Sequence, residues 1–218
     1  MESFLDLLSV SLLISAFGLT AAKRIRSYIK VFQLQSLLLV ASTLTLGLRN
    51  FPNEGILGIL FLAVVIFILK VLVIPRLLSN TYTKVEYTVE KDFFINIPSA
   101  IMICAALVIL TYFTIHSLDG LLNARLKFYL VNALSVVLIG LFFMISRKKA
   151  IGQIVGFLVL ENGLFATALF SANGMPIIVD LGILIDLLTA VMLMGMLVFK
   201  INETFDSINV DRLKNLRG

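Results

Sequence analysis

The chain has 218 residues, of which 60% are hydrophobic and only 14% are charged, and its mean hydropathy is +1.05. A soluble domain is usually about 45–50% apolar, so the composition excludes an ordinary globular protein and predicts an integral membrane protein. The net charge of +5 fits the excess of Lys and Arg expected on the cytoplasmic side of a membrane protein. It therefore gives no reason to expect a nucleic acid partner.

Seven apolar stretches are long enough to cross a hydrocarbon layer of about 30 Å as helices. None shows the alternation of a barrel strand, and only helices or closed barrels satisfy every backbone group in lipid. We therefore predict an all-α bundle of seven transmembrane helices within residues 1–200. The stretches are Phe4–Ala22, Ser27–Leu48, Ile56–Ile74, Phe93–Ile115, Leu126–Ile145, Ile151–Phe170 and Met175–Phe199.

The distribution of basic residues predicts the orientation of this bundle. Glu2 and Asp6 begin the first stretch and a basic run follows it, the reverse of a secretory signal, so this stretch should remain as a helix. Arg49, Arg125 and Lys127 fall on one side of a seven-helix path, and many more basic residues fall on the other. By the positive-inside rule the N-terminus is outside and the C-terminus is cytoplasmic. The basic residues expected inside are Lys23, Arg24, Arg26, Lys30, Arg76, Lys84, Lys91, Arg147, Lys148, Lys149, Lys200, Arg212, Lys214 and Arg217.

The remaining polar sequence is too short for a soluble catalytic domain. Residues 201–218 are too polar to span a membrane, and we expect a cytoplasmic docking tail there, with an interfacial helix as the alternative. Residues 1–78 and 121–200 follow the same plan of helix, basic turn, helix, proline-containing turn and helix. Parallel internal repeats are therefore plausible, although no ungapped side-chain match supports them.

Two acidic residues, Glu161 and Asp186, lie inside apolar stretches. A charge at the centre of a bilayer costs about 2.5–3.5 kcal/mol on insertion scales, so such residues usually have a partner or a function. Each lies about eleven or twelve residues into its stretch, which at ~1.5 Å per residue is close to the midplane. Burial and a neighbouring carboxyl both favour the protonated form. We expect these two acids to form part of a proton path, with a structural interhelical hydrogen bond as the alternative.

Lys70 is the other charge within an apolar stretch, four residues before the predicted end. Its stem could let the ammonium group snorkel to the cytoplasmic interface, or it could neutralise a carboxylate or modulate the proton path. Gln33 and Gln35 point to opposite sides of the second stretch, so at most one should face a shared polar core. These two side chains could form hydrogen bonds with water, or they could hold helices together. Cys104 and His116 are single residues of their kind, which gives no support for a disulfide or a metal site.

Three separated segments resemble hydrogenase-4 component E, a membrane subunit of group 4 [NiFe] hydrogenases and formate hydrogenlyase-like complexes. They are KVLVIPRLL (Lys70–Leu78), LENG (Leu160–Gly163) and INVDRLKNLRG (Ile208–Gly218), and the resemblance extends over nearly the whole chain. The last two or three predicted helices also resemble, more weakly, the K subunit of respiratory complex I and the C subunit of Mrp-type cation/proton antiporters.

The resemblance implies a prokaryotic inner-membrane subunit with no redox site and no cofactor of its own. Its expected partners are antiporter-like membrane subunits, a membrane subunit similar to complex I subunit 1, and the [NiFe] hydrogenase peripheral arm. In the K-type subunits the two intramembrane acids are both Glu; Glu161 matches one, and Asp186 falls where the other would lie. The sequence thus predicts a non-catalytic coupling subunit. The alternatives are a structural adaptor and a subunit of a Mrp-type antiporter.

Overall fold

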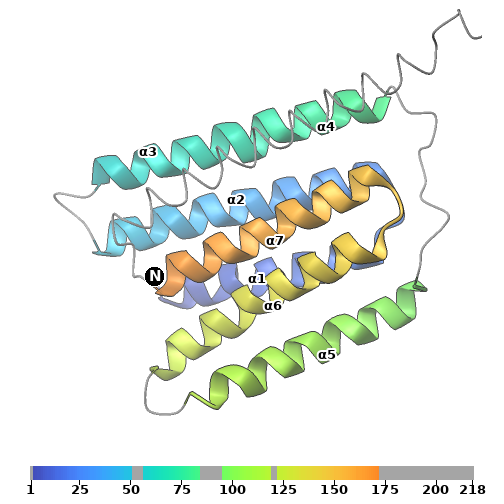
Figure 1. Ribbon diagram of the computed structural model, residues 1–218. Coiled ribbons are helices and arrows are strands. Elements are labelled where there is room, and N and C mark those ends of the chain that lie inside the picture. The colour runs from blue at the N-terminus through green and yellow to red at the C-terminus, as the bar shows by residue number, and fades with distance from the viewer. Residues whose placement is uncertain (1, 51–55, 84–94, 119–121, 172–218) are drawn as a thin grey trace, which may run out of the picture.

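The computed structural model describes residues 2–50, 56–83, 95–118 and 122–171 of the chain. Within these ranges the regular structure consists of helices, arranged as a bundle (Figure 1). The helices are α1 (Glu2–Ala21), α2 (Ile25–Asn50), α3 (Ile56–Ile66), the π-helix η1 (Phe67–Val73), α4 (Ile74–Thr83), α5 (Ile97–His116), α6 (Ala124–Ser146) and α7 (Ala150–Ser171).

The all-α class is confirmed, as are six of the seven predicted stretches. The described part of the chain contains six helices long and apolar enough to cross a membrane, with α3, η1 and α4 forming one of them. The seventh stretch, Met175–Phe199, lies outside the described residues, together with Asp186 and the tail at 201–218. The orientation in the membrane and the repeats, whose second unit extends to residue 200, stay predictions.

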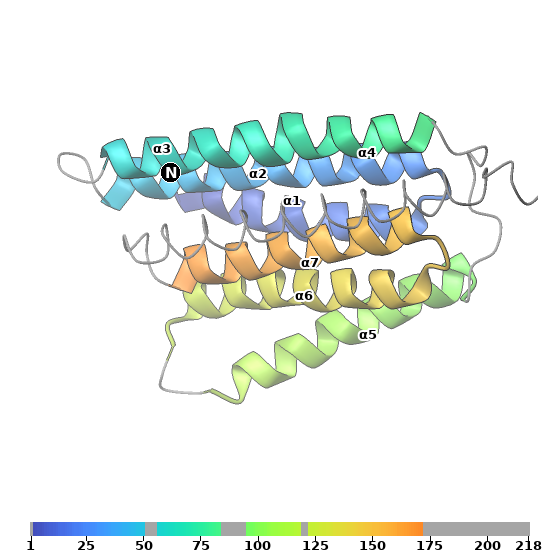
Figure 2. The same cartoon turned by 45° about the horizontal axis from the view of Figure 1, so that its top comes forward.

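Successive spanning helices run in alternating directions, with α3, η1 and α4 counted as one, so α1, α3 and α6 begin at the same end of the bundle (Figure 1). We call this end the N-terminal end. Helix α2 packs against α1, α3 and α7, and α6 packs against α1, α5 and α7. Helix α5 lies at the edge of the bundle beside α6 and diverges from it toward one end, as the second view shows (Figure 2).

Three glycines bring α6 and α7 into close contact. A Cβ atom added to Gly140 would lie 2.5 Å from the backbone nitrogen of Leu160, and one added to Gly163 would lie 2.6 Å from that of Val137. Gly156 is equally close to the backbone of Met144. Small residues allow two helix backbones to approach where lipid supplies no hydrophobic driving force between helices. The backbones of α6 and α7 are therefore in contact over residues 137–144 of α6 and 156–163 of α7.

The third spanning helix extends further than the sequence indicated. It was expected to end at Ile74, but it continues through η1 and α4 to Thr83. Pro75 does not break it: Ile66 and Ile74, on either side of η1, both keep helical dihedral angles. The π-helical turn is one of the local adjustments that let a membrane helix tolerate proline. As a result Lys70 lies well inside a helix, not one turn from its end.

Candidate functional site: a buried lysine and glutamate pair

Helix α7 carries a polar face halfway along its length. Glu161 is the twelfth of its 22 residues, and Asn162 follows it directly. Phe165 is three to four residues further on, so it lies on the same side of the helix as both. The side chains of Glu161 and Asn162 are buried. Glu161 and Asn162 belong to the LENG segment singled out in the sequence, and its last residue, Gly163, lies against α6.

Lys70 of η1 reaches this face. Its Nζ lies 3.3 Å from Oε1 of Glu161 and donates a hydrogen bond to Oδ1 of Asn162 at 3.1 Å. The ammonium group also lies 5.8 Å from the centre of the Phe165 ring, within the range of a cation–π contact. The exposed fraction of the side chain is 1% for Lys70 and 3% for Glu161. Lys70 thus points into the bundle, and the snorkelling alternative is wrong.

The burial of both charges determines what the pair can do. Removing an ion from water is costly, and only a close partner and further hydrogen bonds compensate for it. Here Asn162 supplies a further acceptor for the ammonium group. A proton can also move from Nζ to the Glu161 carboxylate, which gives a neutral amine and a neutral acid. Both states are neutral overall, so the pair can exchange a proton without placing net charge in the protein interior.

The structure places the other candidate residues as follows. Asp186 lies outside the described residues, so its distance from Glu161 stays a prediction. Gln33 holds two helices together, since its Nε2 donates to the backbone oxygen of Val71 at 3.1 Å. Gln35 is fully buried, and its amide atoms have no hydrogen-bond partner among the described residues. The two glutamines therefore have different surroundings, as their spacing predicted.

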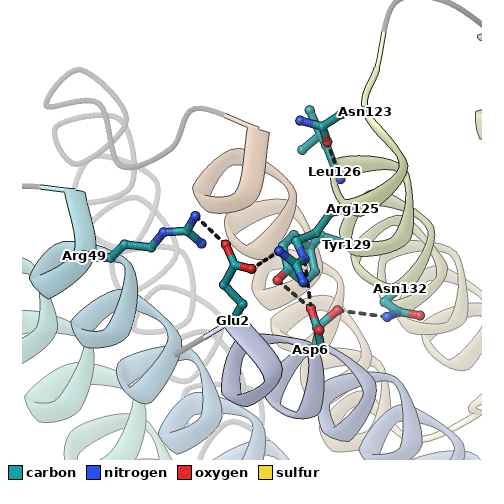
Figure 3. A network of polar contacts seen from close by, with 9 residues as sticks. Glu2, Asp6, Arg49, Asn123, Arg125, Leu126, Tyr129 and Asn132 are labelled. Atoms are coloured by element: carbon teal, nitrogen blue, oxygen red, sulfur yellow. Dashed lines mark hydrogen bonds and ion pairs between the residues drawn. The ribbon is translucent and has the colours of Figure 1, made fainter.

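A second polar cluster, at the N-terminal end, was not predicted from the sequence (Figure 3). Glu2 of α1 forms ion pairs with Arg49 of α2 and with Arg125 of α6. One turn further in, the hydroxyl of Tyr129 donates to Oδ1 of Asp6 at 2.6 Å. Deeper still, Nδ2 of Asn132 donates to the Ser9 hydroxyl at 2.9 Å, a contact that is buried. We call these residues the α1–α6 seam; its members are Glu2, Asp6, Ser9, Arg49, Arg125, Tyr129 and Asn132.

A sequence signal for this seam does exist. Polar residues recur at positions 2, 6 and 9 of α1 and at 125, 129 and 132 of α6, and this spacing keeps them on one face of each helix. The three pairs between α1 and α6 are each 123 residues apart. A constant separation means that two parallel helices pack in one register.

At the opposite end, Arg147 anchors the turn between α6 and α7. The guanidinium group is buried and lies 4.1 Å from the centre of the Phe143 ring and 5.2 Å from that of Tyr28. Its Nη2 donates to the backbone oxygen of Thr20, one of the last carbonyls of α1, at 3.2 Å. A cation is favourable at this position because the C-terminus of a helix carries partial negative charge. Arg147 therefore has a structural role in addition to the one expected for it in membrane topology.

The described residues offer no group of three or more His, Cys, Asp or Glu side chains that could hold a metal ion.

No protein-family profile matches the chain, and neither does any solved structure. It is 28% identical over 214 residues to "Uncharacterized protein Rv0085" of Mycobacterium tuberculosis, an alignment that covers 97% of this chain and 95% of that protein. It is 26% identical over 207 residues to hydrogenase-4 component E of Escherichia coli K12, covering 95% and 94%. The chain is homologous to hydrogenase-4 component E.

This homology confirms the resemblance predicted from three segments. The match to hydrogenase-4 component E from Shigella flexneri has the same extent and identity. Because the alignment covers nearly all of both chains, the two proteins are related over their whole length and not only around the buried pair. The homologues are bacterial, and this chain has several helices that could cross a membrane.

Proposed function

We propose that this chain is a membrane subunit of a hydrogenase-4-like complex and that Lys70 and Glu161 carry protons within it. Asp186 is proposed as a further carboxyl of the same path. The observation that supports this proposal is the Lys70 to Glu161 pair, in which both side chains are buried, in a homologue of a hydrogenase component. Ionisable groups within membrane-spanning segments are rare, and they commonly mark ion pathways and proton relays.

The geometry suggests how the pair takes part. A proton that arrives at Glu161 when Lys70 is charged leaves a net positive charge in a region from which water is excluded. Such a charge is unfavourable, so a proton leaves the pair again, from Nζ of Lys70 or from the carboxyl of Glu161. The hydrogen bond from Nζ to Asn162 keeps the Lys70 side chain in place through this exchange. The pair is thus proposed as one site of the proton path, between a proton donor and a proton acceptor on neighbouring elements.

The redox chemistry belongs to partners in this proposal. We expect this chain to lie in a prokaryotic inner membrane between antiporter-like membrane subunits and a membrane subunit similar to complex I subunit 1, below a [NiFe] hydrogenase peripheral arm. The test is mass spectrometry of the complex recovered in mild detergent through a tag on this chain. Recovery of a [NiFe] large subunit with antiporter-like subunits supports the assignment. Recovery of antiporter subunits alone would instead indicate a Mrp-type cation/proton antiporter.

The proton role is tested by Glu161→Gln, which keeps the size of the side chain and removes its titratable group. We expect the complex to assemble and to evolve hydrogen from reduced viologen at the normal rate, since that reaction takes place in the partners. Proton movement across inverted membrane vesicles during turnover should be lost. Asp186→Asn should have the same effect.

The matched control is Glu2→Gln, the same substitution at a carboxylate whose side chain is 45% exposed. Glu2→Gln should leave both hydrogen evolution and proton movement unchanged. If Glu161→Gln assembled and translocated protons normally, the chain would be a structural adaptor.

A further inference from the structure

The helix that carries Lys70 changes its hydrogen-bonding pattern at that residue. Lys70 is the central residue of the seven-residue π-helix η1. At its end the N–H of Ile74 donates to the backbone oxygen of Leu69, five residues back and not four. Such segments are rare, and short ones within α-helices are frequent at functional sites. Proton transfer by the Lys70 side chain does not by itself require a π-helix, so the π-helical backbone of η1 needs a separate physical cause.

Pro75 removes a donor directly after η1. In an α-helix the backbone oxygen of Val71 would accept a hydrogen bond from the N–H of residue 75, but proline has no N–H. Gln33 of α2 provides a donor in its place, since Nε2 lies 3.1 Å from that oxygen. A side chain from a neighbouring helix therefore replaces a backbone bond one residue after Lys70.

The direction of the Lys70 side chain depends on this arrangement. A π-turn contains one more residue than an α-turn. Conversion of η1 to an α-helix would therefore rotate the part of the helix before η1 relative to the part after it. The rotation about the helix axis would be about 100°, the angle between successive residues of an α-helix. The Nζ contacts of 3.3 Å with Glu161 and 3.1 Å with Asn162 would not survive a rotation of that size.

We propose that Gln33 is a positioning residue: by holding the Val71 carbonyl it maintains the π-helical segment that directs Lys70 toward Glu161. This inference rests on the proposed function, because it assigns to Gln33 the alignment of the proton-carrying pair. Gln33 itself acts through the backbone of η1. Pro75 contributes to the same arrangement, because it has no N–H and so leaves the Val71 oxygen available to Gln33.

The test compares Gln33→Leu, Pro75→Ala and the double variant in the whole complex. Gln33→Leu should keep viologen-driven hydrogen evolution and lower proton movement into inverted vesicles by about tenfold or more, because a misplacement of about 1 Å at a reacting pair has effects of that size. Pro75→Ala restores an N–H that can bond Val71 in the α-helical register. The double variant should stay impaired, since that bond favours the α-helix over η1.

Restoration of proton movement in the double variant would overturn the proposal, because Gln33 would then only satisfy a carbonyl. Full proton movement in Gln33→Leu would overturn it too. The matched control is Gln35→Leu, the same change two residues away on the opposite side of α2, which should have no effect. If Gln33→Leu fails to assemble, Gln33→Asn keeps the amide but shortens its reach, and the same comparison applies.

A second measurement separates this inference from the function on which it rests. If Gln33 acts through Lys70, adding Gln33→Leu to Lys70→Met should cause no further loss of proton movement. Independent, multiplying losses would indicate a general packing role and overturn the inference. Normal translocation in both Glu161→Gln and Lys70→Met would instead refute the proposed function. Loss in those two variants with full activity in Gln33→Leu refutes only the role of Gln33.

Discussion

The α1–α6 seam and the Lys70 to Glu161 pair are built from the same kinds of side chain in opposite surroundings. At the seam, Glu2, Arg49 and Arg125 are each between 41% and 46% exposed, and Glu2 has two basic partners. Inside the bundle, Lys70 and Glu161 are 1% and 3% exposed. Water can replace a lost partner at the seam but not at the buried pair. The contacts at the seam therefore join helices at a surface open to water, whereas the buried pair is the one that we propose for proton transfer.

The largest effect is expected from breaking the buried pair on one side. Lys70→Met removes the ammonium group that lies 3.3 Å from the Glu161 carboxylate, and breaking a buried ion pair on one side costs about 3–5 kcal/mol unless the remaining group takes up a proton. We expect a clear loss of thermal stability of the purified complex, with proton movement strongly lowered but still measurable.

The double variant Lys70→Met with Glu161→Gln sharpens this prediction. It removes both charges, so it should be more stable than Lys70→Met alone, although it should fail to translocate protons because Glu161→Gln by itself removes the carboxyl. Equal stability of the single and double variants would show that Glu161 takes up a proton once Lys70 is replaced, so that no buried charge is left.

The next largest effect is expected from displacing α7, the helix that carries Glu161 and Asn162. In Gly163→Ala the new Cβ would meet the Val137 backbone, and overpacking of this kind costs about 1–3 kcal/mol. Because Gly163 follows Asn162 directly, we expect lower thermal stability together with weaker proton movement. Gly58→Ala is the control, since no atom lies within 4 Å of its added Cβ. A stable Gly163→Ala complex would argue against the close packing of α6 and α7.

A smaller effect is expected within the seam. Tyr129→Phe removes the hydrogen bond to Asp6 but keeps the stacking on Phe170, whose ring centre lies 4.8 Å away. A single hydrogen bond contributes about 1 kcal/mol, so thermal stability should fall slightly. Proton movement should be normal. Loss of proton movement in this variant would mean that the seam belongs to the path.

The smallest effect is expected at the exposed end of the seam. Arg49→Gln removes one of the two cations next to Glu2, and Arg125 remains. Exposed ion pairs contribute little and are screened by salt, so the melting temperature of the complex should hardly change. That small change should vanish in high salt, while the defect of Lys70→Met should persist there. A defect of similar size in both variants would remove the distinction between the two clusters.

The candidate site shows where prediction from sequence was sufficient. Glu161 was identified because a carboxyl group within an apolar stretch has few uses, and the structure places it in a buried polar contact. For Lys70 the sequence allowed two readings. The stem of a lysine is long enough either to reach an interface or to cross to another helix, and the predicted end of the stretch at Ile74 did not decide between the two. The continuation of the helix to Thr83 removed the nearby interface.

The sequence by itself determined that the chain is a bundle of apolar helices, where most of the described helices begin and end, and that Glu161 is buried. Hydrophobicity and length act on each segment separately, so these properties can be read without knowing the neighbours. Only the tertiary structure decided that Lys70 meets Glu161 and Asn162, a residue 92 positions away, and that Gln33 supports the backbone beside it. Such contacts depend on how each helix is rotated about its own axis, and packing between helices sets that rotation.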